Sequence, residues 1–193
     1  MEIWTKEEFS KFSDCLMDNH VSWMAFQILF WTGIRIGELL ALTFADVDLE
    51  QKTLQISKSY QRLKGKDIVT PPKTPKSNRT ISIPQFLADD IQDYKDSLYK
   101  PGPEDRIIPV AKSFLEKEMR RGVKLSGVKK IRIHDLRHSH ASLLINMNFS
   151  PKEIAERLGH ENVETTLNIY SHLYPSKQEE LANRLDTLYQ EFH

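Results

Sequence analysis

The chain has 193 residues, 39% of them hydrophobic, and its 27 lysines and arginines are matched by 27 aspartates and glutamates. It is long enough to bury a proper core as one domain or two small ones, so a soluble globular protein is expected. A single cysteine, Cys15, excludes an internal disulfide and a cysteine-based zinc site. There is no signal-peptide core and no apolar run near the roughly 18 residues of a membrane span, which predicts a cytoplasmic protein without a membrane partner.

The first part of the chain predicts three helices. Thr5 and Glu8 form a capping box for a helix over residues 5–17. The apolar residues 21–31 indicate a buried second helix, and a third is expected over residues 35–42.

Arg35 is unusual beside so much apolar sequence. A buried guanidinium must be paired or hydrogen-bonded. Glu38 lies three residues further on, one helical turn away, so the spacing alone favours an ion pair between the two side chains.

Residues 53–84 have sequence patterns typical of β-strands. TLQIS and RTISIP alternate apolar and polar residues, KDIVT is β-prone, and together they predict a small three-stranded antiparallel sheet. The turn PPKTPKSNR between the later strands is rich in proline, lysine and serine. A basic hairpin tip of this kind can contact a phosphate backbone, and a flexible lysine there can reach a leaving oxygen.

The zero net charge hides an uneven distribution. Residues 52–79 carry eight basic side chains against one acidic, and residues 106–140 carry ten against three, while the other segments are acidic. A surface polarised in this way can face a phosphate backbone, although solvated surface lysines would give the same pattern. On the first interpretation, the expected backbone contacts are Lys64, Lys66, Lys76, Arg79, Lys129, Lys130 and Arg132.

Helical periodicity returns in three later stretches, over residues 85–99, 112–123 and 134–147. In the last of them His134 and Arg137 are one turn apart, so both can address one anion. His138 and His140 crowd the same helix. Because the stretch lacks the glutamate of an H-E-x-x-H zinc helix, we expect no metal site.

Residues 150–175 predict two short helices around a glycine turn. Ser150 and Glu153 form a capping box for the first helix, and Gly159 ends it. The second helix begins near residue 162 and reaches Tyr170. This is the outline of a helix-turn-helix DNA-binding regulator, whose second helix enters the major groove, and the pattern alone leaves that reading open.

Four stretches together resemble the tyrosine recombinases, also called the phage integrase family. They are TGIRIGELLALTFADVD, the PKT of the basic turn, HDLRH, and the segment from His160 through TTLNIYSHL. The stretches occur in the family order, and the resemblance covers Thr5 to about Leu188. It implies a mainly α fold with a small three-stranded antiparallel sheet. Residues 1–193 are then the catalytic domain, and the N-terminal DNA-clamping domain of the family is absent from this chain.

The resemblance also implies how the site works. Two arginines grip the scissile phosphate with the help of a histidine, a tyrosine attacks the phosphorus to give a 3′-phosphotyrosyl enzyme, and a second histidine assists proton transfer. A lysine in the hairpin protonates the leaving 5′ oxygen. This chemistry requires no metal or cofactor. In the order of the chain, the implied catalytic residues are Arg35, Lys73, His134, Arg137, His160 and Tyr170.

The implied function is that of a site-specific recombinase or integrase of a phage or other mobile element, acting on double-stranded DNA. A type IB topoisomerase-like strand transferase is the enzymatic alternative. Leu181, Leu185 and Leu188 form an apolar stripe on a terminal helix, which must pack on its own domain or on a neighbouring protomer. The family resemblance favours a homo-tetramer on DNA, joined through this helix, and a monomer when free.

Overall fold

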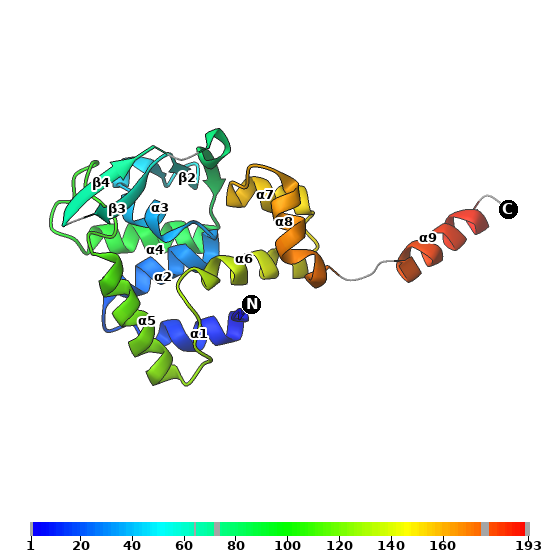
Figure 1. Cartoon of the computed structure of the whole chain (residues 1–193), viewed down its shortest axis with the longest axis horizontal. Coiled ribbons are helices and arrows are strands. Elements are labelled where there is room, and N and C mark those ends of the chain that lie inside the picture. Colours follow the sequence, from blue (N-terminus) through cyan, green and yellow to red (C-terminus); the bar gives the residue numbers. More distant parts are fainter. Residues whose placement is uncertain (1, 64, 72–73, 175–177, 192–193) are drawn as a thin grey trace.

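The computed structural model describes residues 2–63, 65–71, 74–174 and 178–191 (Figure 1). The chain begins with α1 (Lys6–Asp14), α2 (His20–Thr32), α3 (Ile36–Ala41) and the 3₁₀ turn η1 (Phe44–Asp46). The strands are β1 (Val47–Asp48), β2 (Thr53–Ile56), β3 (Ser59–Leu63), β4 (Lys66–Thr70) and β5 (Arg79–Ser82), with the 3₁₀ turn η2 (Pro75–Ser77) before β5. The later helices are α4 (Gln85–Asp96), α5 (Lys112–Ser126), α6 (Asp135–Asn146), α7 (Pro151–Leu158), α8 (Val163–Tyr170), the 3₁₀ turn η3 (Ser171–Leu173) and α9 (Gln178–Glu191).

The mainly helical fold is confirmed, and the ends of its helices follow from local sequence. Both expected capping boxes are present, because the side chains of Thr5 and Ser150 accept from the backbone three residues further on, at 3.2 and 3.3 Å. Gly33 and Gly159 end α2 and α7 at φ values of 68° and 69°. A side chain rarely adopts this left-handed conformation, so glycine fixes both turns.

Helix α2 is the centre of the main core. Figure 1 shows it surrounded by α1, α3, α4, α5 and α6, and its residues are buried on nearly every side. Phe9 of α1 stacks on Phe30 of α2 with ring centroids 3.9 Å apart, and Phe12 meets Phe26 edge to face at 5.0 Å. An all-round apolar helix is stable only when other elements cover it, so the fold is built around α2.

A second, smaller apolar cluster lies where α6, α7 and α8 meet. Ala141 and Ile145 of α6 pack there with Ile154 and Leu158 of α7 and with Tyr170 at the end of α8. The ring of Tyr170 is 1% exposed. Its position is therefore set by core packing on α6.

The pairing of the strands corrects one expectation. KDIVT forms β4, but β4 pairs with β3 as a separate two-stranded hairpin, with Lys66 opposite Leu63. The three-stranded sheet has the order β1-β2-β5, so its third strand is the short β1. The physical reason is local: β3 directly precedes β4, and Gly65 at φ 78° allows the chain to turn back tightly.

The last helix lies apart from the others. In Figure 1 α9 extends away from the other helices, and Leu185 and Leu188 are 57% and 49% exposed. The side chain of Leu181 lies outside the described residues. The two described leucines of the stripe therefore do not pack on the core of their own chain.

Within the ranges given above, no helix has the length and apolar character that crossing a bilayer would need.

The aromatic core should dominate the stability of the protein. Replacing fully buried Phe26 with alanine should lower the free energy of unfolding by about 3 to 5 kcal/mol, because transfer energy is lost and a cavity remains. The matched control is Phe149→Ala, since Phe149 is 40% exposed. Urea denaturation of both variants measures the difference, and equal losses would contradict the central role of α2.

Candidate active site

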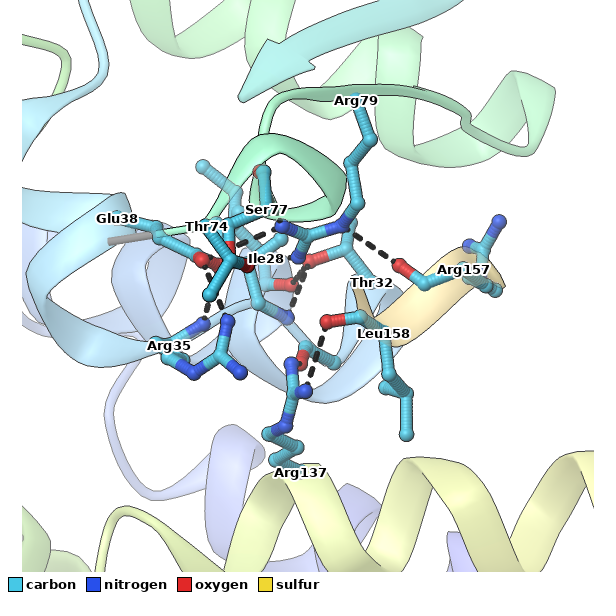
Figure 2. Close-up of polar contacts among 12 residues, drawn as sticks. Ile28, Thr32, Arg35, Glu38, Thr74, Ser77, Arg79, Arg137, Arg157 and Leu158 are labelled. Atoms are coloured by element: carbon cyan, nitrogen blue, oxygen red, sulfur yellow. Dashed lines mark hydrogen bonds and ion pairs between the residues drawn. The ribbon is translucent and has the colours of Figure 1, made fainter. Parts of the chain in front are cut away.

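A buried carboxylate anchors one wall of the candidate site. Glu38 of α3 is 6% exposed and accepts from Arg35 Nη1 at 2.9 Å and from Arg79 Nη2 at 3.0 Å, as Figure 2 shows. It also accepts from the backbone N–H of Arg35 at 2.9 Å. Burial alone would raise the pKa of Glu38, but the hydrogen bond and charge of Arg79, together with Arg35, hold it below its usual value. The ion pair expected between Arg35 and Glu38 is therefore present, and Arg79 is a second partner.

Arg79 joins three separate segments of the chain. Besides Glu38 of α3, its guanidinium donates to the carbonyl of Ser77 at 3.0 Å and, through Nε, to the carbonyl of Arg157 in α7 at 2.8 Å (Figure 2). A Cβ on Gly159 would lie 2.8 Å from Arg79 Nη1, so the turn after α7 closes directly over this side chain. The Arg79 side chain is 7% exposed. The sequence predicts a DNA contact for Arg79, whereas in the structure its side chain is a buried link between β5, α3 and α7.

Arg137 is a buried cation without a carboxylate partner among the residues that the structure describes. It rises from α6 and is 4% exposed. Its Nη1 donates to the carbonyl of Gly33 at 2.8 Å. Its Nη2 donates to the carbonyl of Leu158 at 2.7 Å, as Figure 2 shows. Burial, and then the positive charge of Arg35, lower the pKa of Arg137 to about 9, so the guanidinium stays charged at neutral pH.

His160 lies beside this arginine at the start of the loop after α7. Its Nδ1 is 2.8 Å from the hydroxyl of Thr166 in α8. Burial and the charges of Arg137 and Arg35 lower its pKa to about 4, so the ring is neutral at neutral pH. If Thr166 donates to Nδ1, the proton of the ring is on Nε2, which can then donate to a bound anion.

Tyr170 brings a hydroxyl to the same place. It interacts electrostatically with Arg137, and its oxygen is 2.7 Å from Nδ1 of His138. Burial raises the pKa of Tyr170 to about 12, against the opposing charge of Arg137. The phenol is therefore protonated at neutral pH. Its contact with His138 is a feature that the sequence motif did not assign, although His138 stands one residue after Arg137.

His134 is exposed at the N-terminal end of α6, with its ring centroid 5.1 Å from that of His138. Partial desolvation of the ring and then the positive charge of Arg137 lower the pKa of His134, and Arg35 acts in the same direction. The structure thus brings five of the six expected residues to one place, namely Arg35, His134, Arg137, His160 and Tyr170. Lys73 lies outside the described residues.

A cleft of about 380 Å³ opens next to these residues. It runs between α3, the start of β3, the segment before β5 and the turn after α7. Lys76 contacts one lining residue, since its Nζ donates to the carbonyl of Glu161 at 2.6 Å. The lining residues are Arg35, Glu38, Lys58, Ser59, Thr74, Ser77, Gly159, His160, Glu161 and Thr165.

The other residues expected to contact DNA lie on the described surface, with Lys64 outside it. Lys66 and Lys130 are exposed. Lys129 pairs with Glu8 at 3.2 Å, and Arg132, at 79% exposure, pairs with Asp135 at 2.7 Å. The Lys129 pair is partly exposed and therefore weak, so this side chain can exchange its partner for a phosphate, whereas the carboxylate that holds Arg132 is buried.

Comparison with known sequences places this chain among related proteins. The model of the phage integrase family matches residues 5–177. The chain is 36% identical to the ICEBs1 integrase of Bacillus subtilis (strain 168), over 97% of the chain and 55% of that protein. It is 34% identical to the integrase of Staphylococcus phage L54a, over 85% of the chain and 51% of that protein. The chain thus spans about half the length of these relatives.

Solved structures share the fold. The Tn1549 transposon integrase, in complex with a circular intermediate DNA, superposes with a TM-score of 0.78 at 24% identity, over 97% of this chain and 66% of that one. The catalytic domain of bacteriophage HP1 integrase superposes with a TM-score of 0.66 at 20% identity, over 98% and 97%. The arrangement of helices and small sheets is therefore common to both.

The Glu38–Arg79 pair should be essential to the shape of the site. Arg79→Ala should lower the free energy of unfolding by about 3 to 5 kcal/mol, because it leaves the Glu38 carboxylate buried with a single partner. Arg62→Ala is the control, since Arg62 pairs with Asp67 across an exposed hairpin, and it should cost less than about 1 kcal/mol. Urea denaturation compares the two, and a small, equal loss would mean that the buried pair does not hold α3, β5 and α7 together.

Proposed function

Because the chain belongs to the phage integrase family, the tyrosine recombinases, we propose that it cuts and rejoins double-stranded DNA at specific sites through a tyrosine-linked intermediate, as an integrase of a mobile element. The observation that carries this proposal is the buried, positively charged Arg137 beside the hydroxyl of Tyr170. A buried cation needs an anionic partner, and Glu38 is already shared by Arg35 and Arg79. A phosphodiester supplies the missing negative charge next to a nucleophile.

Arg35, Arg137 and His160 form the binding site for the scissile phosphate. Negative charge grows on the non-bridging oxygens as the nucleophile approaches, and donors fixed in place beforehand stabilise that state best. Arg137 is fixed by two carbonyls, and Arg35 by Glu38. Each such donor contributes a factor of about 10² to 10³ in rate in other enzymes.

The reaction then needs two proton transfers. The oxygen of Tyr170 attacks phosphorus, the bond from phosphorus to the 5′ oxygen breaks, and a 3′-phosphotyrosyl link forms. Tyr170 loses its phenolic proton as it attacks, with His134 assisting this transfer, and Lys73 donates the proton that the leaving 5′ oxygen takes up. Attack by another 5′ hydroxyl reverses these steps and joins a new strand without ATP.

The nucleophile and the phosphate-binding residues belong to one chain. Tyr170 packs against α6, which carries Arg137 and His138, and this supports cleavage in cis.

Residues 1–193 act as the catalytic domain, in the cytoplasm. The exposed leucines of α9 support docking of this helix on a neighbouring protomer, which gives a homo-tetramer on DNA and a monomer when free. Lys66, Lys76, Lys129, Lys130 and Arg132, together with Lys64, contact the DNA backbone.

The first test concerns the nucleophile. On a nicked duplex that loses its cleaved fragment, the wild-type protein should accumulate as a covalent complex, and peptide mapping should place the link on Tyr170. Tyr170→Phe should abolish the complex, whereas Tyr174→Phe should leave it intact. A Tyr170→Phe protein that still links to DNA would end this assignment.

The second test concerns Lys73. A substrate with sulfur in place of the bridging 5′ oxygen has a good leaving group that needs no protonation, so it should restore cleavage to Lys73→Ala. Lys76 is the neighbouring control, because its ammonium already donates to the carbonyl of Glu161, and Lys76→Ala should show no such rescue. Rescue confined to Lys76→Ala would move the role of the acid to that residue. Arg35→Ala should stay slow on both substrates, since charge develops on the non-bridging oxygens in either case.

A further inference from the structure

We propose that His138 is the general base that takes the proton of Tyr170 during cleavage and returns it during rejoining. This inference rests on the proposed function and adds a catalytic residue to it. The distance from His138 Nδ1 to the Tyr170 oxygen is 2.7 Å, so His138 touches the reacting atom itself. A base must lie within about 2.6 to 3.2 Å of the proton it abstracts, and His138 meets this condition before any substrate arrives.

The geometry favours His138 over the neighbouring histidine. The rings of His138 and Tyr170 meet edge to face, with centroids 5.6 Å apart. His134 instead has its ring contact with His138, at 5.1 Å, and within the described residues it makes no hydrogen bond to the phenol. His138 therefore stands between His134 and the nucleophile.

The charges around His138 keep it able to accept a proton. Partial burial lowers its pKa below the usual value, and His134, Arg137 and Arg132 act in the same direction. Asp135 opposes them, and Tyr170 is the titratable group that faces it from α8. His138 is thus neutral at neutral pH, with Nδ1 free to accept when its proton is on Nε2.

Tyr170 needs such a base because its own ionisation is unfavourable. Burial raises its pKa to about 12, so the phenolate is scarce at neutral pH. As the bond from the Tyr170 oxygen to phosphorus forms, the phenolic proton passes to His138 Nδ1. In rejoining, a 5′ hydroxyl attacks, the bond to the tyrosine breaks, and His138 returns the same proton to the departing phenolate. No proton is gained or lost over the cycle.

The first experiment replaces basicity while keeping the hydrogen bond. Asparagine places a polar atom near the position of Nδ1 but cannot take a proton at neutral pH. His138→Asn should therefore slow single-turnover cleavage at neutral pH by about 100-fold or more, the range of general-base contributions. His172→Asn, at an exposed histidine, is the matched control and should cleave at the wild-type rate. If His138→Asn cleaves as fast as wild type, the hydrogen bond between His138 and Tyr170 is only structural. If the variant cleaves faster, the hydrogen bond restrains Tyr170. Either result overturns the proposal.

The pH dependence gives a second readout. Wild-type cleavage should fall as pH drops below the pKa of His138, because a protonated imidazole cannot accept a proton. In His138→Asn this acidic fall should be replaced by a rate that keeps rising with pH, since ionisation of Tyr170 then limits attack. An unchanged pH profile in the variant would count against the base.

The third experiment removes the need for the base. A strand whose 3′ phosphate carries p-nitrophenol in place of tyrosine releases p-nitrophenolate without protonation. In a Tyr170→Phe background, adding His138→Asn should leave the joining of this strand to a 5′ hydroxyl unchanged, which also shows that the site is folded. Arg137→Ala in the same background should abolish joining. Loss of joining with His138→Asn would assign this residue to the phosphate-binding site instead. Failure of the wild-type protein to cleave any duplex would reject the proposed function itself, and with it this inference.

Discussion

An imbalance of buried charge dominates the architecture of this site. Arg35, Arg79 and Arg137 converge from three elements, yet Glu38 is the one carboxylate that ion-pairs within this trio in the described residues. Arg137 has no carboxylate partner among these residues, and backbone carbonyls at the ends of α2 and α7 accept hydrogen bonds from its guanidinium instead. Such an arrangement is tolerable only if the surrounding fold holds the cations apart. The largely buried α2 supplies that rigidity, since the carbonyl of Gly33 directly follows this helix, and the second carbonyl belongs to Leu158, the last residue of α7.

Much of the fold and site was predictable because the relevant signals are local. Capping boxes at Thr5 and Ser150 and the glycines after α2 and α7 mark helix ends directly in the sequence. Arg35, Arg137 and Tyr170 stand in recognisable motifs. Alternation of apolar residues also located the strands. It could not say which strand pairs with which, because pairing depends on chain reversal at Gly65 and on contacts distant in sequence.

Two contacts of the candidate site could not be predicted from the sequence. Arg79 lies in a basic stretch, so composition placed it at a surface, whereas its actual partners are Glu38, 41 residues away, and the carbonyl of Arg157, 78 residues away. His138 is one of three histidines in a short stretch, and only the fold shows that it meets Tyr170, 32 residues further along the chain. No spacing rule within one helix reveals a partner on another.

Helices α7 and α8 are attached to the rest of the protein by two different kinds of contact. Their apolar side chains pack on Ala141 and Ile145 of α6, whereas α7 is tied to the other elements by hydrogen bonds between arginines and carbonyls. Hydrogen bonds can be exchanged for water or for phosphate oxygens, while buried apolar contact resists local opening. The helix pair should therefore stay on α6 when the hydrogen bonds of α7 to the other elements open, and Tyr170 would keep its place beside Arg137 and His138.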